Sequence, residues 1–334
     1  MLQLAIRIRR TVIVVVSLLL SASLAWAQSA TPQQKKLEPV KIFVMLAAHA
    51  APFYVAKELN LFKEEGADVE VVIFASGADA LDAFRAGRGQ FALAGQLPTV
   101  RMWTVSNDFV GISGSQWDKV TNAIVVNRNI ATLADLKGKK IATANGTGGQ
   151  QVLLSALAKV GLRETDLTIV NVSPADSVVT LSRGDVDGVA YWEPFTSQAL
   201  QVMGDKARVL TDSGPYFTGS MILSANRAWL KDHPEETAAV LRTLRKAVDF
   251  INSKPDEAVK LVAKAMRIKD EQAKVQMAPH KYDIAWTPET KSSVDSAVDF
   301  LMRIGAIKSK PDFNVAVDLS FLRKVAPQSV TATQ

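Results

Sequence analysis

The sequence contains no cysteine, so the chain cannot form a disulfide framework and has no thiol that could carry a lipid anchor. Histidine is also scarce, because only His49, His233 and His280 are present, and they are far apart without the spacing of metal ligands. A Gly-x-Ser-x-Gly hydrolase motif is absent as well. We therefore expect no catalytic residue, no metal and no cofactor.

A strong excess of charge is missing too. The chain has 39 basic and 33 acidic residues, and three of the arginines lie in the first 27 residues, which contain no acid. Beyond that segment 36 basic residues face 33 acidic ones, a formal charge near +3. This balance gives no support for a nucleic-acid partner, although it is compatible with an anionic ligand.

Residues 1–27 have the pattern of a secretory signal peptide. Arginines at positions 7, 9 and 10 precede an apolar run from Val12 to Leu20, and Ala25, Trp26 and Ala27 form a small-x-small cleavage site. The apolar run is too short to span a bilayer comfortably, which argues against a membrane anchor. We predict cleavage after Ala27 and a soluble, periplasmic mature protein.

The stretch from Gly138 to Leu157 contains a glycine-rich turn. Its letters predict a buried strand from Lys140 to Ala144, a turn from Asn145 to Gly149 and a helix that opens near Gln150. A helix that begins at such a turn directs unpaired N–H groups and the positive end of its dipole at one point, where an anion can bind. On its own, the motif is equally compatible with a plain tight turn.

The same layout occurs twice, at a constant offset of 97 residues. His49 corresponds to Gly146, Asp79 to Asp176 and Gly87 to Gly184, and the offset holds over three strands and two helices. This pattern predicts two copies of one α/β unit, and therefore a pair of similar domains.

The order of the elements predicts that the chain leaves the first domain near Lys119 and returns near Tyr216. We assign residues 40–120 and 220–325 to domain one and residues 121–219 to domain two. Residues 28–39 are expected to form a disordered tail, and a second tail, residues 326–334, is expected to be frayed. Amphipathic helices after Asn226 are expected to cover domain one.

Several motifs in order resemble one family. APFYVAKELNLFKEEGADVEV, AFRAGRGQFALAG, TLADLKGKKIA, GTGGQ and GDVDGVAYWEPF are similar to segments of the nitrate, sulfonate and taurine family of periplasmic substrate-binding proteins, which serve ABC importers. The resemblance extends from about residue 40 to 226. It implies a type II periplasmic binding fold, in which two Rossmann-like α/β domains joined by two crossings hold a ligand in the cleft between them.

The cleft should be lined by the carboxyl ends of the strands, where open α/β sheets bind ligands. The candidate ligand-binding residues are His49, Ala50, Phe53, Gly77, Gln96, Trp117, Asn145, Gly146, Thr147, Gly148, Gly149, Gln150, Trp192, Glu193 and Tyr216. Among them, the backbone N–H groups of Thr147, Gly148 and Gly149 and the Thr147 hydroxyl are expected to hold an anionic group.

Several of these assignments leave an alternative open. His49 is either a ligand contact or a satisfied loop histidine, and Trp117, Trp192 and Tyr216 clamp an organic ligand or pack at the hinge. Glu193 either caps a helix or binds an ammonium group. Asp79 and Asp176 are interpreted as helix caps rather than ligand groups.

The expected function is capture of a small anionic or zwitterionic molecule, such as a sulfonate, taurine, nitrate or a carboxylate, for delivery to an ABC transporter permease. We expect a monomer. Two rival classes share the fold: an enzyme similar to the pyrimidine synthase for thiamine, and a sensor protein that docks on a receptor. The absence of cysteine and the signal peptide argue against the enzyme, whereas only the partner separates the sensor from a transport protein.

Overall fold

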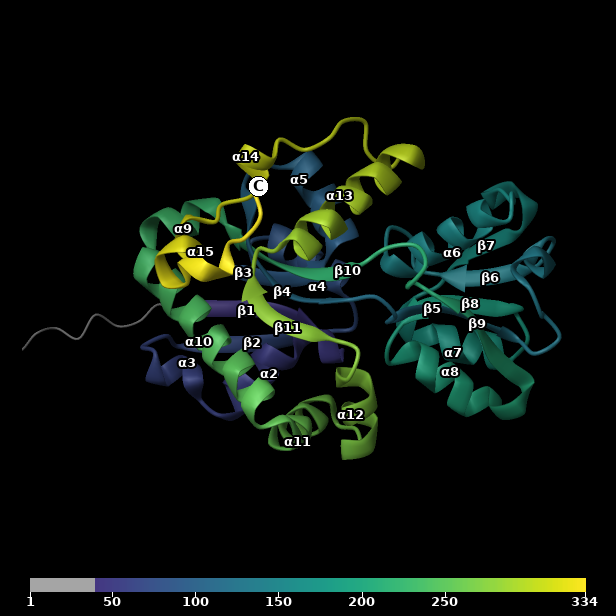
Figure 1. Ribbon diagram of the computed structural model, residues 1–334, viewed down its shortest axis with the longest axis horizontal. Coiled ribbons are helices and arrows are strands. Elements are labelled where there is room, and N and C mark those ends of the chain that lie inside the picture. Colours follow the sequence, from purple (N-terminus) through teal and green to yellow (C-terminus); the bar gives the residue numbers. More distant parts are fainter. Residues whose placement is uncertain (1–39) are drawn as a thin grey trace, which may run out of the picture. The chain divides into compact units, whose positions relative to one another are not determined.

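The computed structural model describes residues 40–334 (Figure 1). The predicted signal peptide, residues 1–27, and the predicted N-terminal tail, residues 28–39, lie outside the described residues and stay predictions. Within residues 40–334, none of the helices combines the length and the apolar character that crossing a bilayer requires.

The first sheet has six strands: β1 (Val40–Met45), β2 (Val69–Phe74), β3 (Phe91–Gly95), β4 (Phe109–Asp118), β10 (Gly219–Asn226) and β11 (Lys281–Ala285). Their spatial order is β11-β4-β10-β3-β1-β2. β1 pairs in parallel with β2 and β3, and β10 lies antiparallel between β3 and β4. β11 pairs antiparallel with β4 at the edge of the sheet.

The second sheet has five strands: β5 (Asn122–Asn127), β6 (Lys140–Thr143), β7 (Thr168–Asn171), β8 (Gly188–Trp192) and β9 (Ala207–Asp212). Their order is β7-β6-β8-β5-β9, with β6 parallel to β7 and β8 and with β5 antiparallel to β8 and β9. The chain passes to this sheet through residues 119–121 and returns through residues 213–218.

The two sheets share one strand order, which confirms the predicted duplication. The run β2-β1-β3 in the first sheet corresponds to β7-β6-β8 in the second. The next strand is β10 in the first sheet and β5 in the second, and each is antiparallel to its neighbour in that run. Each is also the first strand after the chain has crossed from the other sheet. The offset of 97 also holds for the caps, because Ser76 and Ser173 each accept a hydrogen bond from the N–H of Asp79 or Asp176. The serines are therefore the N-caps, and each aspartate accepts a bond of 2.7 Å from its serine hydroxyl.

Four helices and one 3-10 turn connect the first strands: η1 (Ala48–Ala50), α2 (Ala51–Glu58), α3 (Leu61–Glu64), α4 (Gly77–Arg85) and α5 (Gln96–Val105). Asn60 adopts a left-handed conformation with φ of 56° and separates α2 from α3. Asparagine tolerates this conformation better than most residues, because its short polar side chain can bond locally.

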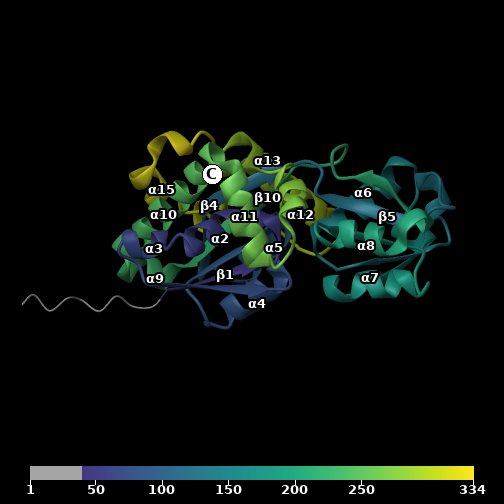
Figure 2. The same ribbon diagram turned by 90° about the horizontal axis from the view of Figure 1, so that it is seen from below.

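Helices cover both faces of the second sheet. They are η2 (Leu133–Leu136), α6 (Gly148–Lys159), η3 (Glu164–Asp166), α7 (Pro174–Ser182), α8 (Phe195–Met203) and η4 (Gly204–Lys206). α6 packs against β5 and β8, and α7 and α8 pack against each other and against the sheet. Figures 1 and 2 show α6 on the face opposite to α7 and α8.

The C-terminal segments are α9 (Arg227–Asp232), α10 (Pro234–Ser253), α11 (Pro255–Met266), α12 (Asp270–Met277), α13 (Pro288–Arg303), α14 (Phe313–Ala316), α15 (Ser320–Val325) and η5 (Pro327–Ser329). α10 packs against α2, and α13 packs against α5 and β10. In Figure 1, α5 and α13 lie above the strands and α2, α10 and α11 lie below them. The predicted apolar face of α10 is buried at Leu241, Leu244, Val248 and Ile251.

The frayed tail predicted after Lys324 is a wrong prediction, because this stretch is bonded to the fully buried Trp286. Trp286 and Val330 form a parallel bridge, and Thr331 N–H donates to the Trp286 carbonyl over 3.0 Å. The indole N–H of Trp286 donates to the carbonyl of Thr333, also over 3.0 Å.

β4 contains a segment rich in serine and glycine, a composition that is more typical of a loop than of a strand. The strand is continuous because its glycines allow close packing rather than a turn. A Cβ on Gly111 would lie 2.6 Å from Trp103 Cζ2, and a Cβ on Gly114 would lie 2.7 Å from the Ala285 carbonyl oxygen. Glycine in a strand interior commonly marks such a close approach.

Candidate functional site

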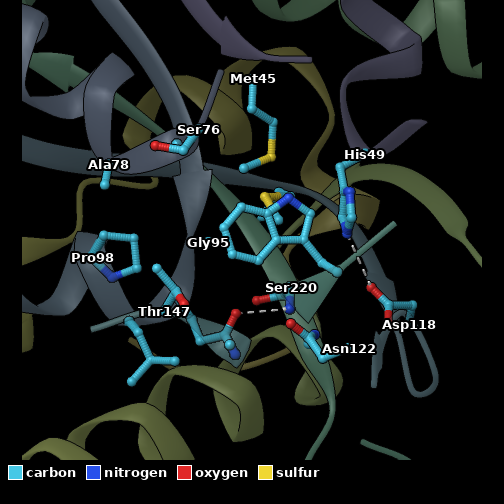
Figure 3. A pocket seen from close by; sticks show the side chains of 17 residues that line it. Met45, His49, Ser76, Ala78, Gly95, Pro98, Asp118, Asn122, Thr147 and Ser220 are labelled. Atoms are coloured by element: carbon cyan, nitrogen blue, oxygen red, sulfur yellow. Dashed lines mark hydrogen bonds and ion pairs between the residues drawn. The ribbon is translucent and has the colours of Figure 1, made fainter. Parts of the chain in front are cut away.

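A cavity is lined by residues of both sheets and their connections (Figure 3). Its wall is formed by Met45, His49, Ser76, Gly77, Ala78, Gly95, Gln96, Leu97, Pro98, Asp118, Asn122, Thr147, Gly148, Trp192, Gly219, Ser220 and Met221.

Three helices begin in this wall, at the carboxyl ends of β2, β3 and β6. α4 starts after Ser76, α5 after Gly95 and α6 after Thr147. In α6 the first helical hydrogen bond runs from Gln151 N–H to the Thr147 carbonyl, so the amides before Gln151 have no partner in the preceding turn. In α4 the Asp79 N–H is already bonded to Ser76 Oγ, so the amides that correspond to those of α6 precede Asp79. The ends of three dipoles therefore favour negative charge in the cavity.

The predicted glycine turn contributes its residues unequally. Thr147 and Gly148 lie in the wall, but the Thr147 hydroxyl donates to the Ala144 carbonyl over 2.6 Å instead of remaining available for a ligand. Gly149 faces the sheet, where a Cβ would lie 2.2 Å from the Ala190 carbonyl oxygen.

The other members of the turn hold its shape. Gly146 has a φ of 72°, and its N–H donates to Gln150 Oε1 over 2.7 Å. Asn145 N–H donates to Asn171 Oδ1 over 3.0 Å. The structure therefore places Asn145, Gly146, Gly149 and Gln150 outside the wall residues, as supports of the turn.

Gln96 lies in the wall with 4% of its surface exposed, and its amide connects elements. Gln96 Oε1 accepts from Ser220 N–H over 3.2 Å, and Gln96 Nε2 lies 3.5 Å from Gln151 Oε1 on α6. The amide thus links the starts of α5, β10 and α6. This arrangement positions the wall and leaves the remaining lone pair and proton of Gln96 as the groups that a ligand could contact.

The aromatic candidates separate into one wall residue and two others. Trp192 lines the cavity and packs edge-on against Phe195, with ring centroids 5.9 Å apart. Trp117 lies in β4 opposite Ser220 and is not a wall residue. Tyr216 follows the end of β9, where its hydroxyl lies 3.3 Å from the hydroxyl of Thr211. The hinge interpretation therefore fits Trp117 and Tyr216, and the clamp interpretation fits Trp192.

Three further candidates lie outside the wall residues. Ala50 and Phe53 are fully buried in the hydrophobic core around η1 and α2. Glu193 Oε1 accepts from the hydroxyl of Thr196 in the first turn of α8, whereas the N-cap residue of that helix is Pro194. Of the 15 candidates, those that the structure brings together in the wall are His49, Gly77, Gln96, Thr147, Gly148 and Trp192.

Besides Ser76, which caps α4, sequence reasoning missed three polar wall residues: Asp118, Asn122 and Ser220. All three flank a crossing, because Asp118 ends β4, Asn122 begins β5 and Ser220 is the second residue of β10. Polar residues at the ends of otherwise apolar strands, beside the predicted crossings, were the available signal. Asn122 also touches α6, since a Cβ on Gly148 would lie 2.3 Å from Asn122 Oδ1.

The negative charge of the wall is concentrated at Asp118, which is 1% exposed. Asp118 Oδ1 accepts bonds from the N–H and hydroxyl of Thr121, at 3.1 and 2.5 Å. Burial opposes ionisation, but bonds and charge from His280 and further help from His49 and Thr121 outweigh it and hold the pKa of Asp118 below its ordinary value. The wall residues include no lysine or arginine that could pair with this carboxylate.

His49 lies beside Asp118, on the side of the cavity away from Ser76, Pro98 and Thr147 (Figure 3). Burial, reinforced by the charge of His280, lowers the pKa of His49 to about 3 although Asp118 opposes the shift, so the ring is neutral at physiological pH. His280 stacks at a tilt on His49, with ring centroids 4.5 Å apart. Two of the three histidines, separated in sequence, therefore meet in the fold.

Comparisons with known proteins agree with this architecture. Residues 47–258 match the family model described as NMT1/THI5 like. A candidate aliphatic sulfonates-binding protein of Bacillus subtilis is 30% identical over 327 residues, which cover 95% of this chain and 96% of the relative. The taurine-binding periplasmic protein of Escherichia coli is 27% identical over 235 residues, 65% of this chain and 69% of that protein.

A solved structure supports the same assignment. The periplasmic aliphatic sulphonate binding protein SsuA from Escherichia coli superimposes with a TM-score of 0.71 and 25% identity, over 84% of this chain and 92% of that chain. The match to the family model spans most of the first two thirds of the chain, and the Bacillus relative aligns with nearly all of it. This chain therefore belongs to the NMT1/THI5-like family and has the fold of the periplasmic binding proteins.

Proposed function

We propose that this chain is a periplasmic solute-binding protein that captures a small organic anion of the sulfonate class and delivers it to the permease of an ABC importer. The observation that carries the proposal is the convergence of α4, α5 and α6 on one cavity, which offers several N–H donors to a single anionic group. The names of the Bacillus and Escherichia coli relatives support the class of ligand.

A sulfonate suits such a wall because its three oxygens can accept bonds from three directions. Each hydrogen bond to a charged group contributes roughly 1.5 to 3 kcal/mol, so neutral backbone donors can hold an anion without a lysine or arginine. Met45, Leu97, Trp192 and Met221 supply apolar surface in the same wall, which matches an alkyl substituent.

The experiment is titration calorimetry with ethanesulfonate, taurine and nitrate, compared with dimethyl sulfone as an uncharged analogue of similar shape. We expect an anion to bind and the sulfone to show no binding. A ligand at a hundred times its Kd also stabilises the fold by about 2.7 kcal/mol, which gives an independent thermal-shift readout. Equal binding of the sulfone and the sulfonate would refute the anionic site.

The proposal includes three further expectations from the sequence: export with cleavage after Ala27, a monomeric protein, and binding without chemical change. Mass spectrometry of the exported protein tests the cleavage site. Mass spectrometry of the ligand released by denaturation tests whether the ligand is chemically unchanged. Loss of sulfonate uptake in a strain lacking this chain, restored by the gene, tests delivery to an importer. A transformed ligand with turnover would favour the enzyme instead.

A further inference from the structure

Three buried side chains from distant parts of the chain meet at one edge of the cavity. His49 belongs to η1, Asp118 ends β4, and His280 directly precedes β11. One ligand atom from each lies within 4.8 Å of the others, and all three residues are buried. The cluster goes beyond the proposed function, because capture of an anion by helix ends requires no part of it.

The distances within the cluster are those of groups that share a cation. His280 Nδ1 lies 3.6 Å and His49 Nε2 lies 3.9 Å from the same oxygen, Asp118 Oδ2. Both separations exceed a hydrogen bond of 2.7 to 3.2 Å. Ligands about 2.0 to 2.1 Å from a tetrahedral zinc ion are about 3.3 Å apart, so each imidazole nitrogen needs to approach Asp118 Oδ2 by a few tenths of an ångström.

The electrostatics of the cluster also favour a cation. Asp118 is buried, and among the described residues its ion-pair partners within 4.0 Å are these two imidazoles. An imidazole nitrogen binds a metal ion through its lone pair. A buried carboxylate is normally paired with a cationic side chain or bound to a metal.

The remaining polar contacts leave the cluster incompletely satisfied. His49 Nδ1 and His280 Nε2 are buried and have no hydrogen-bond partner among the described residues. Gln116 Oε1 lies 3.1 Å from His280 Nδ1, and Thr121 Oγ1 lies 3.4 Å from His49 Nε2. The Gln116 and Thr121 oxygens therefore lie next to the three ligand atoms of the cluster, and either oxygen could serve as a fourth ligand. These two unpaired nitrogens are not the ones that approach Asp118 Oδ2, so a water rather than the ion would satisfy them.

We propose that His49, Asp118 and His280 bind one divalent transition-metal ion, with zinc as the best fit to two imidazoles and a carboxylate. The ion neutralises the carboxylate that faces the cavity and connects η1, the end of β4 and the segment before β11. Because Asp118 also holds Thr121 in the first crossing, the ion fixes the position from which the chain leaves the first sheet.

The test is metal analysis of the untagged, exported protein after removal of metal by a chelator and reloading with Zn²⁺. We expect one zinc ion per chain by mass spectrometry of the element, a raised Tm on loading, and a tetrahedral Co²⁺ absorption spectrum after exchange. His280→Asn should weaken zinc binding at least about tenfold, while circular dichroism shows a folded protein.

His233→Asn is the matched control, because His233 stacks on Trp229 with ring centroids 4.6 Å apart and lies outside the cluster. It should keep the metal and the Co²⁺ spectrum. If the parent protein binds no Zn²⁺ and no Co²⁺, or if His280→Asn binds them as tightly as His233→Asn, the inference is overturned and a shared proton explains the cluster. Neither result affects the anion titration, so failure of this inference and failure of the proposed function are distinguishable.

Discussion

Replacement of Gly148 by aspartate places a carboxylate where the anionic group of the ligand is expected. Gly148 is the first residue of α6 and lies in the cavity wall. A Cβ at this position would lie 2.3 Å from Asn122 Oδ1, so any side chain displaces the Asn122 amide as well. The change therefore has a steric component and an electrostatic component, and the two must be separated.

Gly148→Asn separates them, because asparagine has nearly the same bulk as aspartate and no charge. Two like charges about 6 Å apart repel by roughly 3 kcal/mol at an effective dielectric constant of about 20. Screening and relaxation reduce this value, so we expect Gly148→Asp to bind a sulfonate at least about tenfold, or about 1.4 kcal/mol, more weakly than Gly148→Asn.

Titration calorimetry of both variants measures this difference, with circular dichroism and Tm as controls for folding. An acidic residue in the first turn of a helix interacts favourably with the dipole, so the aspartate should not destabilise α6 through its charge. Equal affinities of the two variants would place the anion away from α6, and the glycine turn would then serve packing alone.

Three other predictions concern stability and motion. Gly149→Ala should destabilise the fold by about 1 to 3 kcal/mol in urea unfolding, since its Cβ would lie 2.2 Å from the Ala190 carbonyl oxygen; an unchanged midpoint would contradict this packing. Bonds from Arg242 and Lys246 lower the pKa of Glu65. Their contribution to the free energy of unfolding should therefore be present near pH 7 and lost as the pH falls below about 4.5. Glu65→Gln should abolish that part of the pH dependence of stability. Saturating ligand should reduce the radius of gyration in solution scattering if the two crossings act as a hinge, and an unchanged radius would exclude closure.

The duplicated architecture could be predicted from the sequence because its signals are local and repeated. The strands β3 and β8, the serine caps before Asp79 and Asp176, and the left-handed Gly87 and Gly184 all recur at the same offset. Each depends on a backbone conformation or a period that neighbouring residues specify. The buried face of α10 could be predicted in the same way, because its apolar residues recur at helical spacing.

The side chains of the site could not be placed in the same way, because their neighbours come from distant segments. Asp118, Asn122 and Ser220 enter the cavity only where the crossings bring the two sheets together. His49 and His280 are 231 positions apart in the numbering and meet because β11 pairs with β4 beside η1. The Ser/Gly composition of β4 does not predict a continuous strand either, because the contacts that require its glycines are made with other elements of the fold.

The turns after β1 and β6 differ between the two copies, and this difference gives the cavity two chemically distinct sides. In the second copy the turn after β6 opens α6 at the cavity, whereas in the first copy the turn after β1 forms η1 and places His49 beside Asp118. α2 then begins with Ala51 and Pro52, and proline has no N–H to offer. One wall therefore presents the N-termini of α4, α5 and α6, and the opposite wall presents the buried carboxylate of Asp118 and the imidazole of His49 (Figure 3). In the metal-free protein we therefore expect an anionic ligand to bind with its charged group at the helix ends and its substituent toward His49 and Asp118.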